Sequence, residues 1–138
     1  MLPTVAIVIL NWNGRKVLET YLPSVLNTTY EAATIYVADN ASTDDSVSWL
    51  QTHYPQVTCI TMDKNRGYAG GYNTALKEIE ADYFVLLNSD VEVEPNWLQP
   101  MVTLMESDPN IAACQPKIKS FIQKSHFVKD FTIQREKE

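Results

Sequence analysis

The sequence predicts an α/β fold, with a mostly parallel sheet and helices on both of its faces. Three observations support this prediction. Short apolar runs alternate with segments of helical spacing along most of the chain, as in proteins built on a parallel sheet. The runs are apolar without interruption, which is typical of strands buried on both faces. Several runs end in small polar residues, and parallel strands bring such ends to one edge of the sheet.

The composition is that of an ordinary globular chain. It has 138 residues, of which 45% are apolar and 20% charged, so it is one domain or part of a larger one. The net charge of −6 disfavours a nucleic acid or an anionic membrane surface as partner. We therefore expect no nucleic-acid binding.

The chain shows no targeting pattern. Its beginning lacks the basic segment and apolar core of a signal peptide. Its longest apolar run, Val5 to Leu10, is far shorter than the ~18 residues of a membrane span. Cys59 and Cys114 lie inside apolar runs and are expected to be free core thiols in a reducing compartment. We expect a cytoplasmic protein, whose work can take place at the inner face of the membrane.

The first expected strand is Val5 to Leu10, followed by the turn sequence Asn11-Trp12-Asn13-Gly14. Apolar residues at helical spacing then predict a helix over Arg15 to Leu26. Pro23 lies inside this helix and is expected to kink or restart it, because proline lacks a backbone N–H and crowds the preceding turn.

The second expected strand is Thr34 to Ala38, and it ends on Asp39-Asn40-Ala41-Ser42. Ser42 is predicted to be the N-cap of the next helix, with acidic residues in the first turn. That helix is expected to end at His53, before Tyr54-Pro55.

The third expected strand is Val57 to Met62, followed by a glycine-rich joint over Asp63 to Gly71. A helix is predicted from Tyr72 to Ile79. The next run, Tyr83 to Leu87, is the fourth expected strand, and it stops on Asn88-Ser89-Asp90.

Pro95 is predicted at the first position of a helix over Asn96 to Glu106, where its missing N–H costs nothing. Ile111 to Cys114 is expected to be the last strand. These elements place a domain at residues 1–118 and a polar tail at residues 119–138. Part of the tail, from Phe121 to Val128, has loosely helical spacing, and the end is expected to fray.

The ends of four successive strands carry polar clusters. One such cluster is ordinary turn chemistry, and Asp90 alone would be read as a turn or cap residue. Four on one edge, with a glycine-rich joint among them, are better explained by a ligand crevice. A carboxylate there can hold Mg²⁺ or Mn²⁺, which in turn can hold phosphate oxygens. The clusters are Asn11-Trp12-Asn13-Gly14, Asp39-Asn40, Asn65-Arg66-Gly67 and Asn88-Ser89-Asp90.

The same clusters, in this order, make the chain resemble family 2 glycosyltransferases, especially the rhamnosyltransferase-like members. The resemblance covers residues 4–118, and each motif alone is weak whereas four in order are specific. The matching segments are Val8 to Gly14, Val37 to Asp44, Asn65 to Asn73 and Leu86 to Val93.

The resemblance implies a glycosyltransferase-A fold, with a Rossmann-like, mostly parallel sheet in its nucleotide-sugar-binding half. It also implies a role in cell-envelope polysaccharide biosynthesis. The implied reaction is inverting transfer from a nucleoside-diphosphate sugar, with Mg²⁺ or Mn²⁺, to a saccharide or lipid-linked acceptor. It also implies site residues. Asn11 and Trp12 would flank the base, Asp39 and Asn40 would contact base and ribose, Arg66 and the loop from Gly67 to Gly71 would line the nucleotide site, Asn88 would lie near the ribose, and Asp90 would bind the metal.

The chain departs from the family pattern in two places. The family often has Asp-Asp where this chain has Asp39-Asn40, and Asp-x-Asp where it has Asn88-Ser89-Asp90. Asparagine keeps a carbonyl acceptor and adds a donor, but it loses the charge. We interpret both differences as matters of specificity, because the rhamnosyl-like branch shows them too.

The acceptor-binding half of the family, with its general base, would follow after this point. General-base catalysis needs a group within hydrogen-bond reach of the acceptor hydroxyl. The remaining candidates, His126, Asp130 and the terminal glutamates, lie in the tail and are weak, so the catalytic base is not identified. The chain is expected to be a donor-binding part, and apolar surface left exposed by the missing half is expected to promote self-association.

Other functions fit less well. A non-catalytic module that binds nucleotide sugars or a protein partner remains the main alternative. A Rossmann oxidoreductase or methyltransferase would need a G-x-G-x-x-G turn, and only Gly14 follows the first strand. A nucleotidyltransferase would need a basic triphosphate-binding turn there, which Asn11 to Lys16 does not provide.

Overall fold

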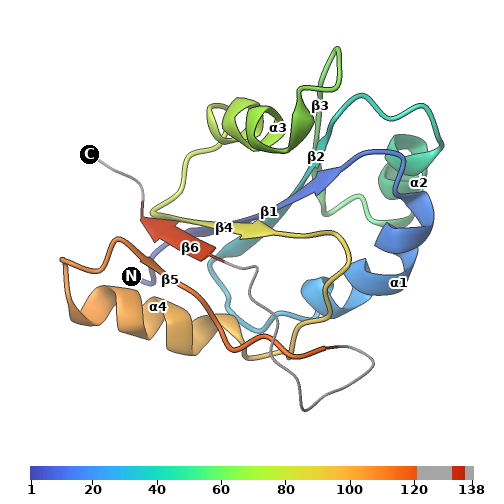
Figure 1. The fold of residues 1–138 in the computed structure, drawn as a ribbon. Helices are drawn as coiled ribbons and strands as arrows, with labels where there is room; N and C mark the ends of the chain where they lie inside the picture. Colours follow the sequence, from blue (N-terminus) through green and yellow to red (C-terminus); the bar gives the residue numbers. More distant parts are fainter. Residues whose placement is uncertain (121–131, 136–138) are drawn as a thin grey trace.

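The computed structural model of the chain describes residues 1–120 and 132–135, which form one sheet and four helices. The strand order is β3-β2-β1-β4-β6-β5 (Figure 1). The strands are β1 (Val5–Asn11), β2 (Ala33–Asp39), β3 (Thr58–Thr61), β4 (Tyr83–Leu87), β5 (Ala113–Cys114) and β6 (Thr132–Arg135). The helices are α1 (Arg15–Leu26), α2 (Ser46–His53), α3 (Gly67–Leu76) and α4 (Leu98–Ser107).

The sheet is mostly parallel. Strands β1 to β4 pair in parallel, whereas β6 pairs antiparallel with both β4 and β5. Strand β1 lies between β2 and β4, so three carboxyl ends meet at the middle of one edge. The predicted α/β architecture is therefore confirmed.

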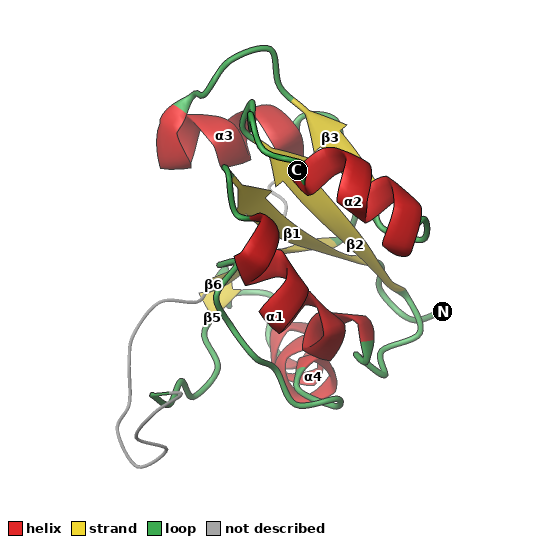
Figure 2. Ribbon diagram, turned by 90° about the vertical axis from the view of Figure 1, so that its right-hand side faces the viewer, coloured by secondary structure: helices red, strands yellow, loops and turns green. Residues whose placement is uncertain are grey.

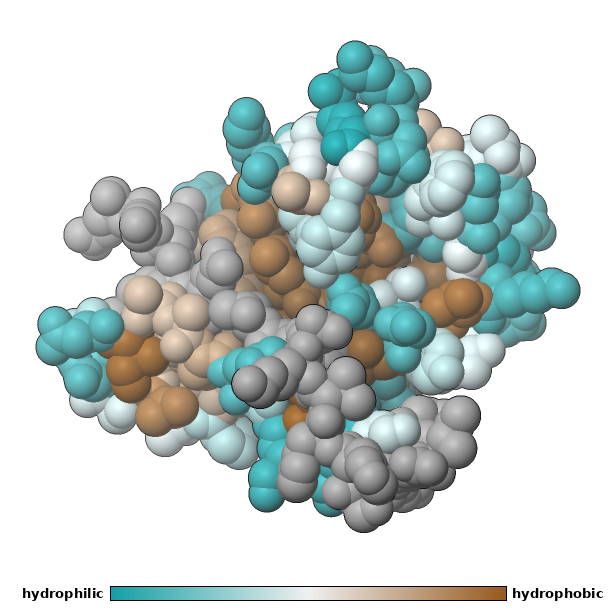
Figure 3. Space-filling model, in the orientation of Figure 1, coloured by the Kyte–Doolittle hydropathy of each residue, from teal (hydrophilic) through white to brown (hydrophobic). Residues whose placement is uncertain are grey.

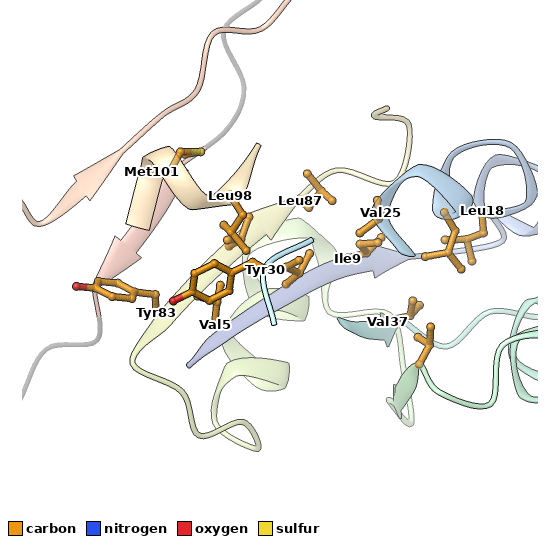
Figure 4. Close-up of a cluster of buried hydrophobic side chains, with 14 of the residues drawn as sticks. Val5, Ile9, Leu18, Val25, Tyr30, Val37, Tyr83, Leu87, Leu98 and Met101 are labelled. Atoms are coloured by element: carbon orange, nitrogen blue, oxygen red, sulfur yellow. The ribbon is translucent and has the colours of Figure 1, made fainter. Parts of the chain in front are cut away.

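Helices cover both faces because the strands are apolar on both sides. Alternate residues of β1, Val5, Ile7 and Ile9, pack in one buried cluster with residues of α1, α2 and α4 (Figure 4). The intervening residues Ala6 and Val8 pack in a second cluster with α3. Figures 1 and 2 show α3 on one side of the sheet, with α1 and α4 on the other. The alternation follows from the two-residue period of a strand.

Helix α1 runs without a break through Pro23, so the predicted restart there is wrong. Pro23 stands in the last turn, and only Ser24 to Leu26 follow it in the helix. The residue four positions earlier, Glu19, is exposed, so water can satisfy the carbonyl that proline leaves without a backbone donor. The proline therefore costs the helix little at this position.

Ser42 is not a helix N-cap, contrary to the prediction. Helix α2 begins at Ser46, and its cap residue Asp45 makes no side-chain capping bond. The Asp44 carboxylate instead accepts the backbone N–H of Ser46 at 3.0 Å. The hydroxyl of Ser42 is used elsewhere: it donates to Asp39, three residues earlier, and accepts from Asn11 at the end of β1. A local motif cannot reveal the second bond, because Asn11 lies 31 residues away.

Helix α3 begins at Gly67 rather than at Tyr72, so the glycine-rich segment is largely helical and not a loop. Gly67 has φ +71°, a conformation that suits glycine. Gly71 allows a close approach, because a Cβ there would lie 2.7 Å from Leu10 Cδ1. The glycines thus let a helix pack tightly on the sheet, and their helix-breaking tendency is overridden.

The elements after β4 also start later than predicted. Helix α4 begins at Leu98, not at Pro95 or Asn96, and a turn closed by the Trp97 N–H to the Glu94 carbonyl precedes it. The Pro95 carbonyl accepts two bonds from Thr29, which hold this turn against the end of α1. Strand β5 contains only Ala113–Cys114 of the predicted Ile111 to Cys114, and β3 is shorter than predicted by two residues.

The stretch expected as a polar tail contains a strand of the sheet. Thr132–Arg135 forms β6, in which Thr132 to Arg135 pair with Leu86 to Tyr83 of β4. The expected helical segment from Phe121, and the candidate bases His126 and Asp130, lie outside the described residues. No helix in the described part of the chain is long and apolar enough to cross a membrane.

Candidate functional site at the carboxyl edge of the sheet

The carboxyl edge of the sheet brings together the predicted site residues from four separate segments. In the β1–β2 ladder Asn11 pairs with Asp39, and Asn40 donates its N–H to the Asn11 carbonyl at 2.8 Å. The beginning of α3 lies against the ends of β2 and β4, because the Gly67 carbonyl accepts from Asn40 and the Tyr68 hydroxyl donates to Asn88. Residues from positions 11 to 90 therefore share one edge.

Asp39 is the centre of a buried cluster. Its Oδ1 accepts hydrogen bonds from Asn11 Nδ2 at 2.9 Å and from Ser42 Oγ at 2.6 Å, and its Oδ2 accepts the Ser42 N–H at 2.9 Å. Only 2% of Asp39 and 1% of Asn11 is exposed. Both oxygens of the carboxylate are therefore used inside the protein, where they fix the turn after β2.

Asn40 forms a second buried cluster with the β3–α3 connection. Its Nδ2 donates to the Gly67 carbonyl at 3.0 Å and to Asn65 Oδ1 at 3.1 Å. Its Oδ1 accepts the Arg66 N–H at 2.8 Å. An amide is the group that can do this, because the two nitrogen contacts need a donor and the oxygen contact needs an acceptor.

The close approach of the Asn11 side chain explains why residue 14 is a glycine. A Cβ at Gly14 would lie 2.4 Å from Asn11 Oδ1, so any other residue would force the turn to move. This Oδ1 is buried and has no hydrogen-bond partner in the described part of the chain. Asn13, with φ 50°, completes the turn and accepts the N–H groups of Thr43 and Asp44 at 2.7 and 3.2 Å.

The end of β4 is much more open. Asp90 is exposed, and Asn88 and Ser89 are half-buried. Asn88 Oδ1 accepts a hydrogen bond from the Tyr68 hydroxyl at 3.0 Å. The next tyrosine on α3, Tyr72, is buried and donates its hydroxyl to the Leu87 carbonyl at 3.0 Å. Burial and the neighbouring Tyr68 raise the pKa of Tyr72 far above its ordinary value, so it stays a neutral donor.

Two other predicted residues are exposed. Trp12 is 59% exposed after β1, so its ring is available for stacking on a ligand. The Arg66 guanidinium is bound to Asp63 Oδ1 at 2.7 Å, and this contact lowers the pKa of Asp63. Figure 3 shows a hydrophilic surface over the β3–α3 connection and apolar atoms between α3 and β4.

A cavity of about 440 Å³ adjoins the end of β4. Its lining includes Asn88, Asp90 and the segment from Val91 to Glu94, together with the segment from Pro116 to Ser120. Its size is that of an ordinary small-molecule site. The polar end of β4 thus faces a hollow, whereas Asp39 and Asn40 are closed off.

The described residues can hold a metal only together with a ligand. No group of three or more His, Cys, Asp or Glu side chains gathers at one point in residues 1–120 and 132–135. A fully protein-built cage is therefore absent from that part. Asp90 offers one exposed carboxylate, which matches the way Mg²⁺ is bound beside a nucleotide, through one or two carboxylates with phosphates and water.

Sequence reasoning missed or left without a partner three residues of this edge. Ser42 was assigned to a helix cap, and Tyr68 was treated as part of the glycine-rich joint. Asn65 was placed in a polar cluster at the edge, but no contact was assigned to it. Each acts through a bond to a residue at least 20 positions away, to Asn11, Asn40 and Asn88 respectively. Only the repeated polar residues on the segment gave a signal for them, and that signal does not name a partner.

Comparison with known proteins agrees with the fold. The model of glycosyl transferase family 2 matches residues 6–136. The chain is 32% identical over 113 residues to chondroitin synthase of Escherichia coli, covering 80% of this chain and 16% of that protein. It is 25% identical over 125 residues to an uncharacterized glycosyltransferase of Haemophilus influenzae, covering 88% of this chain and 39% of that protein.

Solved structures show the same architecture. A mannosyltransferase from Pyrobaculum calidifontis, in complex with GDP-Man and Mn²⁺, aligns with a TM-score of 0.80 at 22% identity, covering 98% of this chain and 45% of that one. S. aureus TarS 1–349 in complex with UDP-GlcNAc aligns with a TM-score of 0.74 at 18% identity, covering 84% of this chain and 34% of that one. This chain spans less than half the length of each of these four proteins. Since the family model matches nearly all of it, the chain belongs to glycosyl transferase family 2.

Proposed function

We propose that this chain is the donor-binding part of a metal-dependent glycosyltransferase. The donor is a nucleoside-diphosphate sugar, and the sugar passes with inversion to a hydroxyl of a saccharide or lipid-linked acceptor. The observation that carries the proposal is the convergence of Asn11, Asp39, Asn40, Asn88 and Asp90 at one edge of a parallel sheet, beside a cavity. Ligands of such sheets bind outside the carboxyl ends of the strands.

The open and closed parts of this edge have different tasks in the proposal. The exposed Trp12 ring stacks on the base, and the buried Asp39 and Asn40 shape the turn and the helix start that surround it. The backbone around Gly67 lets the nucleotide approach, since glycine offers no side chain there. Asn88 and Asp90 contact the part of the donor nearest the cavity.

Asp90 is the proposed ligand for Mg²⁺ or Mn²⁺. A cation bound there supplies positive charge for the diphosphate, which otherwise faces a chain of net charge −6. The structure of the mannosyltransferase from Pyrobaculum calidifontis contains Mn²⁺ and GDP-Man, which supports the use of a divalent cation with a nucleotide sugar. Titration calorimetry tests it directly, with UDP, dTDP and GDP, each in Mn²⁺ and again in EDTA.

We expect one nucleotide to bind in Mn²⁺ and to lose at least tenfold in affinity in EDTA. Asp90→Ala should abolish the metal dependence. Glu80→Ala is the matched control, because Glu80 is an exposed acid at the opposite, amino end of β4. Binding that is equally strong with EDTA, or equally reduced by both substitutions, would contradict the metal assignment.

A non-catalytic binding module is the second candidate. No base for the acceptor hydroxyl is assigned among the described residues, 1–120 and 132–135, so binding without transfer is the other activity that this edge of the sheet supports. The two candidates differ in turnover: a catalytic donor half, joined to its acceptor half, releases free nucleoside diphosphate, and a binding module does not. Sedimentation over a range of concentrations tests the self-association that exposed apolar surface would promote.

A further inference from the structure

We propose that Tyr68 is a positioning residue that holds the Asn88 carboxamide so that its nitrogen, not its oxygen, faces the donor. The inference rests on the proposed nucleotide-sugar function and deepens it. Its starting point is the pair of bonds that α3 makes to consecutive residues at the end of β4, from Tyr68 to Asn88 and from Tyr72 to Leu87.

The Tyr68 ring is supported although it is 63% exposed. It meets the Tyr72 ring edge-on, with centroids 5.0 Å apart and planes at 71°. Tyr72 is 3% exposed and belongs to the apolar cluster between α3 and the sheet. Because the two tyrosines are four residues apart on a helix, they lie on the same side of it. The exposed Tyr68 ring is thus held in place by its contact with the buried Tyr72 ring.

Helix α3 is itself fixed against the sheet. A Cβ at Gly71 would lie 3.2 Å from Asn40 Nδ2 and 2.7 Å from Leu10 Cδ1, so the helix already touches the ends of β1 and β2. Asn40 holds the start of the helix through the Gly67 carbonyl. The Tyr68 hydroxyl is therefore carried on a rigid support, which makes its bond to Asn88 a means of orientation.

The bond decides which part of Asn88 a ligand meets. Asn88 Oδ1 accepts from Tyr68, and among the described residues Nδ2 makes no hydrogen bond. Asn88 lines the same cavity as Asp90. An amide nitrogen donates hydrogen bonds and does not ligate a hard cation. The two polar residues at the end of β4 thus have different roles: Asn88 donates to an oxygen of the donor, and Asp90 serves the metal.

A double-mutant cycle tests the coupling. Affinity for the nucleoside diphosphate that binds tightest in Mn²⁺ is measured for the wild type, Tyr68→Phe, Asn88→Ala and the double variant. We expect Tyr68→Phe to weaken binding about fivefold when Asn88 is present, and to have no further effect in the Asn88→Ala background. Equal weakening in both backgrounds would overturn the proposal, because Tyr68 would then contact the ligand itself.

A second measurement needs no ligand. The side-chain amide resonances of Asn88, identified in the ¹⁵N spectrum by their loss in Asn88→Ala, should shift in Tyr68→Phe. They should stay unchanged in Tyr36→Phe, the matched control, whose ring packs on the same face of the sheet. Unchanged resonances in Tyr68→Phe overturn the positioning role alone. Absence of nucleotide binding by the wild type would instead overturn the proposed function, and with it the ligand-facing part of this inference.

Discussion

The end of β2 and the end of β4 carry the same kind of residues and stand in opposite environments. Asp39 and Asn40, at the end of β2, are 2% and 3% exposed. Both oxygens of Asp39 and both polar atoms of the Asn40 side chain form hydrogen bonds inside the protein. Asp90, after β4, is exposed, and Asn88 accepts one bond from Tyr68. The first pair builds the edge, and the second pair is available to a ligand.

The difference comes from what surrounds each strand end. Strand β2 lies between β1 and β3, and the segments after all three strands fold over its end. The segment that follows β4 lines a cavity instead. A polar residue at a strand end therefore indicates the edge of the sheet where ligands bind, but its neighbours determine whether it touches the ligand. Three predictions test this contrast, from the largest expected effect to the smallest.

Asp39→Ala should lower the free energy of unfolding by about 3 kcal/mol, because it removes the acceptor of three hydrogen bonds. The donors of the buried Asn11 and the half-buried Ser42 would then lack this acceptor. Asp90→Ala, at the open end, should change it by less than about 0.5 kcal/mol. Urea unfolding of both variants gives the comparison. Similar losses in the two variants would show that the two ends do not differ in the way we describe.

Asn40→Asp should cost about 2 kcal/mol, although it restores the Asp-Asp pair common in the family. The new carboxylate would replace a nitrogen that donates to Asn65 Oδ1 and to the Gly67 carbonyl, so acceptors would face acceptors in a buried place. Asn88→Asp should be nearly neutral, because a carboxylate there can still accept from Tyr68. Thermal unfolding of the two isosteric variants gives the comparison. A large loss of stability in Asn40→Asp and a small one in Asn88→Asp would confirm that the first end is closed and the second is open.

Cys59 lies on β3, beside the end of β2. The pH dependence of its alkylation rate should show that this environment is closed. Burial, and then the charge of Asp39, raise the pKa of its thiol from 9.0 to about 11. The thiolate is the reactive form, so its fraction at pH 9 should be about one hundredth instead of one half. In a Cys114→Ser background, the alkylation rate of the folded chain should still rise about tenfold per pH unit between pH 9 and 10. A rate that levels off near pH 9 would mean that this thiol is neither buried nor near a negative charge.

Much of the fold was predictable because it depends on local patterns. Uninterrupted apolar runs located β1, β2 and β4 within a residue at each end, since only strands buried on both faces can use them. Helix starts were predicted less well. The starts of α2, α3 and α4 are set by Asp44, by the close packing of Gly71 and by the bonds from Thr29 to Pro95, and two of these three are long-range contacts.

The candidate site divides in the same way. The strand-end residues could be listed from the chain alone, because chain order and strand direction place them on one edge. Their exposure could not. Asn40 was expected to contact the ligand like Asn88, yet its side chain is used by Asn65, Arg66 and Gly67, about 25 residues along the chain.

Sequence by itself determined the alternation of strands and helices, the edge that gathers the polar residues, and the motifs shared with family 2 glycosyltransferases. These follow from periodicity and order, which are properties of the chain. Tertiary structure alone decided which side chains at that edge are closed and which are open. It made Asp39 and Asn40 internal acceptors and donors, left Asp90 in water, and aimed Asn88 through Tyr68. The physical reason is that each side chain has a fixed number of hydrogen-bond donors and acceptors. Only its neighbours in the folded chain determine whether these bind other residues or remain available to a ligand.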